Sequence, residues 1–288
     1  MSSDQKDLKL AHQKFTEDLK KKGRSVSTIL AYDNDTKQLV EFLQRKKISQ
    51  ATSVNSEQIE EFIKLLFDEG YTAKSVSRKL NSIKAFFRFL KAENFISQDP
   101  AEDIPHPKFE AKPPRILSKM EYRALRDASR DNPRLSAIIE LLLQTGMRIG
   151  ELGRLENNDV SDKEIKIKAY ESHFSREVPL NQSAKKAIER YLENRPKTKT
   201  KIIFVTRPGR PFLVRNIRTA IDRYFRLAGI KNAKVNSLRH TFIAHQLQSG
   251  APVTLVQKLV GHKRLSTTEK YLSLIEDKGE ETVRLEEL

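Results

Sequence analysis

Two arginines, a histidine and a tyrosine lie near expected helix ends in the second half of this 288-residue chain. They are Arg148 in TGMRIGEL (145–152), Arg239 in SLRHTFIAHQLQSG (237–250), and His262 and Tyr271 in LVGHKRLSTTEKYLSL (259–274). Guanidinium groups bind the non-bridging oxygens of a phosphodiester bidentately and stabilise the additional charge of its pentavalent transition state. Histidine can donate to the same phosphate, and a tyrosine hydroxyl held in line with phosphorus becomes a nucleophile. The set predicts a phosphotyrosyl intermediate that requires no cofactor and no metal.

Arg148 is expected between two helices. Gly146 would end the first helix, and Glu151 would lie one turn into the second, close enough to hold the guanidinium. Taken alone, Arg148 also suits a simple surface ion pair with Glu151. The combination of all four groups at consecutive helix breaks favours a site.

Arg239 and His240 are expected in the first turn of a helix over 237–249, after a loop that ends at Asn236. His240 and His245 taken singly suit packing or helix capping rather than metal binding. We include His240 with Glu151 as supporting residues of the site.

Tyr271 is expected in a short helix over 266–274. Ser266 and Glu269 have the spacing of a capping box, which would place Tyr271 early in that helix rather than in a core. Taken alone, Tyr271 also suits the edge of an amphipathic helix.

The three segments resemble the motifs TGxRxxEL, HxLRHTFAT and LGHxxxxTTxxY of the tyrosine recombinase (phage-integrase-like) family, and the length resembles its Xer branch. The resemblance implies that Arg148 and Arg239 bind phosphate, that His262 is a second phosphate donor, and that Tyr271 attacks DNA and leaves a free 5′-hydroxyl. It also implies double-stranded DNA as partner and strand exchange by a homotetramer on two sites through a Holliday junction, without ATP. A monomer or dimer would be the free form.

Two residues depart from the family pattern. Asn236 stands at the first histidine of HxLRH, and asparagine can donate to phosphate but cannot shuttle a proton. Glu171 stands at the lysine of a GKGxKxR-like hairpin turn, the residue that protonates the leaving 5′ oxygen in the family. The nearest substitutes are Lys166, Lys168 and His173, of which we prefer Lys168 because its long side chain on a hairpin can reach the minor groove and phosphate.

The resemblance predicts a Xer-like enzyme that resolves chromosome or replicon dimers, with a role in chromosome partition and the cell cycle. A phage or plasmid integrase has the same chemistry, and a type IB topoisomerase-like enzyme uses similar residues without exchanging strands between sites. The departures at Glu171 and Asn236 leave open a DNA-binding protein with impaired catalysis.

The distribution of charge indicates nucleic acid as the partner. The chain carries a net charge of +16, of which residues 1–110 hold 19 basic and 17 acidic groups and residues 111–288 hold 35 and 21. Without the acidic tail 276–288, residues 111–275 hold 33 basic and 15 acidic groups. A balanced lysine-rich surface would pair these cations with glutamate, so phosphate binding explains the excess better.

The periodicity predicts a mainly α protein with a small β component. An all-helical domain is expected over 1–104, a Pro-rich linker with five prolines between Pro100 and Pro114 over 105–116, and an α/β domain over 117–288. The family resemblance implies that the first is a SAM-like core-binding domain and the second the catalytic domain. The second domain should contain an antiparallel hairpin formed by EIKIKAY and REVPL, and a short strand KIIFVT. The tail 276–288 is expected to be a frayed end or, as the resemblance implies, a segment that docks on a neighbouring protomer.

Composition excludes several classes of protein. The chain has no cysteine, so disulfides, thiolate nucleophiles and zinc fingers are excluded. The six histidines show no HExxH-like spacing. The start lacks the apolar run of a signal peptide and no apolar stretch approaches membrane-spanning length, so we expect a cytoplasmic protein.

Overall fold

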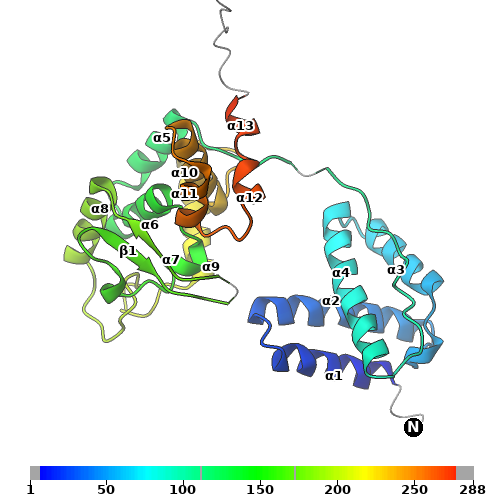
Figure 1. The fold of residues 1–288 in the computed structure, drawn as a ribbon. Helices are drawn as coiled ribbons and strands as arrows, with labels where there is room; N and C mark the ends of the chain where they lie inside the picture. The colour runs from blue at the N-terminus through cyan, green and yellow to red at the C-terminus, as the bar shows by residue number, and fades with distance from the viewer. Residues whose placement is uncertain (1–6, 111, 172, 277–288) are drawn as a thin grey trace, which may run out of the picture. The chain divides into compact units, whose positions relative to one another are not determined.

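The computed structural model describes residues 7–110, 112–171 and 173–276, and the chain divides into two compact units between residues 111 and 112 (Figure 1). The stretch from 104 to 118, where described, contains neither helix nor strand. No helix among the described residues is long and apolar enough to cross a membrane. The predicted tail lies outside the described residues beyond Glu276.

The N-terminal unit is helical, as predicted. Its helices are α1 (Leu8–Lys21), α2 (Val26–Arg45), α3 (Ser56–Asp68) and α4 (Ala73–Ala92), with a 3₁₀ turn at Ala51–Ser53 (Figure 1). A capping box of Asn55 and Gln58 opens α3. Phe86 and Phe87 of α4 are fully buried, so the aromatic stripe of this helix forms core.

The C-terminal unit surrounds α6 (Pro133–Thr145), which packs against α5 (Lys119–Ser129), α8 (Gln182–Glu193) and α10 (Val235–Gln248). Nine of the 13 residues of α6 are buried, which is typical of a helix at the centre of a core. The remaining elements are α7 (Ile149–Leu152), a 3₁₀ turn (Asn157–Asp159), β1 (Glu164–Ile167), β2 (Arg176–Pro179), α9 (Val214–Leu227), α11 (Val253–Val260), α12 (Ser266–Glu269) and α13 (Ser273–Glu276).

The predicted hairpin is the sheet of this unit. β1 and β2 pair antiparallel with Ile165 opposite Val178, and both side chains are buried. Beyond the strands, Tyr170 and His173 bridge each other, and Glu171 adopts a left-handed conformation with φ of 51°. The hairpin therefore presents the turn that contains Glu171 at its tip.

The prediction of a strand at KIIFVT (201–206) is wrong. Ile202 and Val205 form only isolated bridges, to Glu156 and Pro211 respectively. The segment is nevertheless buried at Ile203, Phe204 and Val205. Its β-branched composition reflects burial in the core rather than pairing in a sheet.

The prediction of a single helix over 266–274 is also wrong, because the segment forms two short helices, α12 and α13. Ser266 does not cap α12; Leu265 stands at its N-cap without a side-chain capping bond. Tyr271 lies in the turn between the two short helices.

Candidate active site

Arg148 is positioned by an abrupt end of α6. Gly146 has φ of 60°, and a Cβ added there would lie 2.4 Å from the Phe242 ring, so only glycine fits. Arg148 then stands at the N-cap of α7, where its backbone N–H donates to Glu151 Oε2 at 2.8 Å and its Nη1 donates to Oε1 at 3.0 Å. The prediction that Glu151 holds Arg148 is confirmed.

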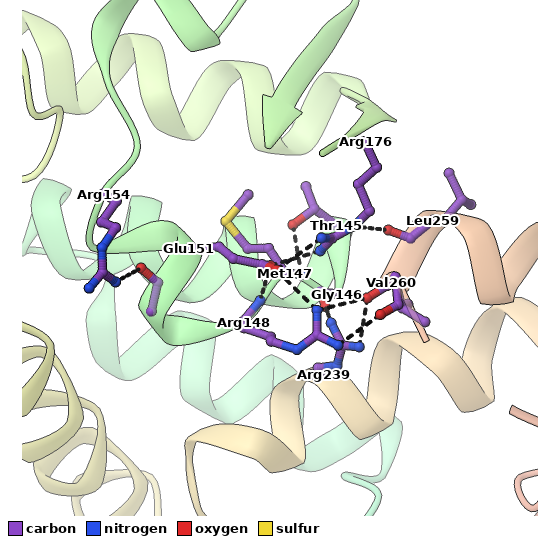
Figure 2. Close-up of polar contacts among 12 residues, drawn as sticks. Thr145, Gly146, Met147, Arg148, Glu151, Arg154, Arg176, Arg239, Leu259 and Val260 are labelled. Carbon is purple, nitrogen blue, oxygen red and sulfur yellow. Dashed lines mark hydrogen bonds and ion pairs between the residues drawn. The ribbon is translucent and has the colours of Figure 1, made fainter. Parts of the chain in front are cut away.

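Three arginines converge on the last carbonyls of α11 (Figure 2). The contacts run from Arg176 Nε to Leu259 at 2.7 Å, from Arg239 Nη2 to Val260 at 2.7 Å, and from Arg148 Nη2 to Gly261 at 2.8 Å. These carbonyls have no partner within the helix and form the negative end of its dipole. The arginines therefore complete the end of α11, and that role fixes the orientation of each guanidinium.

Both predicted phosphate-binding arginines have N–H donors that they do not use within the described part of the chain. A guanidinium has five N–H donors. Arg239 uses one on Gly146, at 2.5 Å, and one on Val260, while Arg148 uses three, on Glu151, Val260 and Gly261. Within the described part of the chain, the other donors of both side chains have no hydrogen-bond acceptor.

The charge of this cluster is unbalanced. Arg176 donates to both oxygens of Glu151, at 2.9 and 2.7 Å. Burial by itself would raise the pKa of Glu151, but hydrogen bonds and charge from Arg176 and Arg148 lower that pKa to about 2. Burial, reinforced by the charge of Arg148, lowers the pKa of Arg239 to about 9, so this guanidinium remains charged at neutral pH. Three cations around one carboxylate leave a surplus that favours an incoming anion.

His262 follows directly on the C-cap of α11, Gly261. Its Nδ1 lies 2.9 Å from Thr268 Oγ1, and its ring stacks 6.4 Å from the ring of Tyr271. Burial, together with the charge of Arg239, lowers the pKa of His262 to about 4. The imidazole is therefore neutral near pH 7.

Tyr271 is buried, with 5% of its surface exposed, which corrects its expected place outside a core. It packs in an apolar cluster with Phe242, Val256 and Val260. Burial raises the pKa of its hydroxyl, although the charge of Arg239 acts in the opposite direction. Its hydroxyl lies 2.6 Å from His240 Nδ1.

The start of α10 differs from the expectation. The helix begins at Val235, so Asn236 belongs to its first turn rather than to a loop, and Arg239 and His240 lie in its second turn. Asn236 is exposed and lines a hollow of about 1070 Å³ together with the basic residues Arg218 and Lys231.

Comparison with known proteins identifies the family. The model of the phage integrase family matches residues 115–277, and that of the phage integrase N-terminal SAM-like domain matches residues 13–94. The chain belongs to the phage integrase family. It is 33% identical over 261 residues to the tyrosine recombinase XerD of Staphylococcus haemolyticus, with 87% of this chain and 88% of that protein covered. It is 31% identical over 270 residues to the tyrosine recombinase XerC of Anoxybacillus flavithermus, with 89% and 90% covered.

These similarities make the chain a Xer-like site-specific tyrosine recombinase, a DNA strand-exchange enzyme, as the motifs predict. The fold agrees. The fold is similar to that in the crystal structure of a lambda integrase tetramer bound to a Holliday junction, with a TM-score of 0.75 and 19% identity. The aligned region covers 90% of this chain and 78% of the lambda integrase chain.

The hairpin of the recombinase does not bring Lys168 to the arginines. Lys168 Nζ pairs with Glu156 at 2.7 Å and Asp159 at 3.0 Å, contacts that raise its pKa. His173 lies closer to the cluster: burial and the charge of Arg148 lower its pKa, and its buried Nδ1 has no hydrogen-bond partner among the described residues.

Sequence reasoning missed two residues of the recombinase site, Arg176 and Thr268. The GKGxKxR-like pattern ends in an arginine, and aligning Val178 with the family hairpin places Arg176 there, so this signal was present. Thr268 belongs to the TTxxY motif, but its contact with His262 arises because α12 folds back on the turn after α11, which the motif spacing does not show. Over the described ranges 7–110, 112–171 and 173–276, no three metal-ligating side chains cluster.

Proposed function

We propose that this recombinase cuts and rejoins duplex DNA through a 3′-phosphotyrosyl link to Tyr271. The proposal rests on the unused N–H donors of Arg148 and Arg239. These two side chains belong to a positively charged cluster beside Tyr271 and His262. A phosphate takes up such donors and offsets the surplus charge.

In the proposed reaction, Arg148 and Arg239 bind the non-bridging oxygens and stabilise the charge that develops at phosphorus. If His262 Nδ1 accepts from Thr268, its proton resides on Nε2, which donates to the same phosphate. Tyr271 Oη attacks phosphorus and the bond to the 5′ oxygen breaks. The new ester conserves the energy of the old one, so rejoining requires no ATP.

We retain Lys168 as the proposed general acid for the leaving 5′ oxygen. Its side chain is 55% exposed and that of Glu156 is 34% exposed, so this ion pair is weak and a phosphate can replace Glu156. Asp159 is buried, with 6% of its side chain exposed, and a phosphate has to displace this carboxylate as well. His173 is the alternative, supported by its buried Nδ1, for which the described residues offer no hydrogen-bond partner.

We further propose that a homotetramer acts on two double-stranded sites and resolves chromosome or replicon dimers. The tetrameric assembly of the structurally similar lambda integrase on a Holliday junction and the excess of cations in residues 111–275 support this. An integrase of a phage or plasmid would share the chemistry but join different sites.

Covalent trapping tests the proposal. Duplexes selected for binding from a randomised pool are nicked so that the released strand diffuses away, and adducts are scored on denaturing gels. The wild-type chain should form an adduct, and Tyr271→Phe, which keeps the ring, should bind equally well and form none. Tight binding without any wild-type adduct would favour the DNA-binding protein with impaired catalysis, which the departures at Glu171 and Asn236 motivate.

A further inference from the structure

Tyr271 requires a proton acceptor that the family motif does not supply in this chain. Its hydroxyl is buried and its pKa is raised, so very little phenolate exists near pH 7. Asn236, at the position of the family's histidine, is exposed and has no basic nitrogen. The acceptor must therefore come from elsewhere or the nucleophile remains protonated.

One side chain is in place to accept this proton. His240 Nδ1 lies 2.6 Å from Tyr271 Oη, within the reach required of a general base. His240 and Asn236 are four residues apart in α10, so they share one face of the helix, one turn from each other. We propose that His240 is the catalytic base that deprotonates Tyr271, displaced by one helical turn from the family's histidine. The inference rests on Tyr271 being the nucleophile.

The surroundings of His240 suit this role. Burial lowers its pKa below the usual value, and the adjacent Arg239 acts in the same direction, so the imidazole is neutral near pH 7. The titratable groups that face it are Arg239 on its own helix, Tyr271 from the turn after α12, and His262 after α11. Arg239 also disfavours the imidazolium, and a bound phosphate would relieve that effect.

The proton balance closes within the site. With its own proton on Nε2, His240 accepts the Tyr271 proton on Nδ1 as Oη forms its bond to phosphorus. The bond from phosphorus to the 5′ oxygen breaks, and that oxygen takes a proton from the general acid. On rejoining, the 5′-hydroxyl attacks phosphorus, and His240 returns its proton to the departing Oη.

Single-turnover cleavage of the nicked duplexes described above tests the inference. His240→Gln should slow adduct formation by about 100-fold or more, the usual contribution of a general base, with unchanged DNA affinity. His245→Gln, an exposed histidine on the same helix, is the matched control and should cleave at the wild-type rate. Adding Asn236→His to His240→Gln should recover at least about tenfold, because it restores a base on the same helix face.

The pH profile separates a base from a structural residue. Wild-type cleavage should decrease as the pH falls through the His240 pKa, which lies below the usual value of about 6.5. His240→Gln should lose that decrease. Wild-type-like rates in His240→Gln, a slow variant with an unchanged profile, or no recovery with Asn236→His would overturn the inference. A wild-type chain without any adduct would instead overturn the proposed function on which it rests.

Discussion

At the scale of the residue, Glu151 allows three guanidinium groups to share one small volume. Its carboxylate is buried and bonded to Arg148 and Arg176, and its pKa is lowered from 4.5 to about 2. A carboxylate with a lowered folded-state pKa stabilises the fold above its unfolded pKa and loses this contribution as the pH falls through the folded value. The contribution is about 3 kcal/mol, at about 1.4 kcal/mol per pKa unit.

We therefore predict that Glu151→Gln lowers the free energy of unfolding by about 3–5 kcal/mol near pH 7, because it leaves the arginines without their counter-charge. The wild-type chain should lose stability between pH 4.5 and about pH 2, and the variant should lose less over that window. Urea unfolding of the full chain across this range measures both effects. Glu164→Gln, exposed on β1, is the control, and equal stability of the two variants would contradict the role of Glu151.

The sequence predicted the residues that stand at helix ends better than those whose role depends on packing. Arg148 and Glu151 could be paired because Glu151 follows Arg148 by three positions, just after the glycine that ends α6. The burial of Tyr271 could not be predicted, because it arises from contacts with Phe242 and Val260 on other helices. Arg176 is too distant in sequence from Glu151 for local spacing to connect them.

At the scale of the element, helix boundaries with a capping or glycine signal were predictable. α6 ends at Gly146, as expected, and the hairpin register follows from burial of alternate residues. The prediction of a strand at KIIFVT failed because β-branched residues also fill a core without pairing with another strand. The left-handed backbone conformation of Glu171 in the hairpin turn also could not be predicted, because the alternation of residues along a strand says nothing about the turn.

The proposed general acid, Lys168, lies on the hairpin. Lys168→Ala should cleave about 100-fold or more slowly on ordinary DNA, yet near the wild-type rate when sulfur replaces the bridging 5′ oxygen, because a thiolate leaves without a proton. His173→Gln is the matched variant and should respond equally to both substrates. Rescue by sulfur in His173→Gln alone would assign the acid to His173, and rescue in neither would exclude both.

At the scale of the whole molecule, charge is concentrated in the second unit, where residues 111–275 hold 33 basic and 15 acidic groups. Binding to duplex DNA should therefore depend steeply on salt. Between 50 and 200 mM salt we expect the affinity to fall by about 10³-fold or more, as for six to ten phosphate contacts. Fluorescence anisotropy with the full chain measures this slope, and affinity independent of salt would contradict phosphate binding as the main contribution.

The most direct test of the account is to locate the covalent link itself. An adduct trapped on a nicked duplex is digested with nuclease and protease, and the peptide that carries the residual nucleotide is sequenced by mass spectrometry. We predict a nucleotide attached through its 3′-phosphate to Tyr271, and a free 5′-hydroxyl on the released strand. Attachment to another residue, or a 5′-phosphate on the released strand, would contradict the proposed reaction.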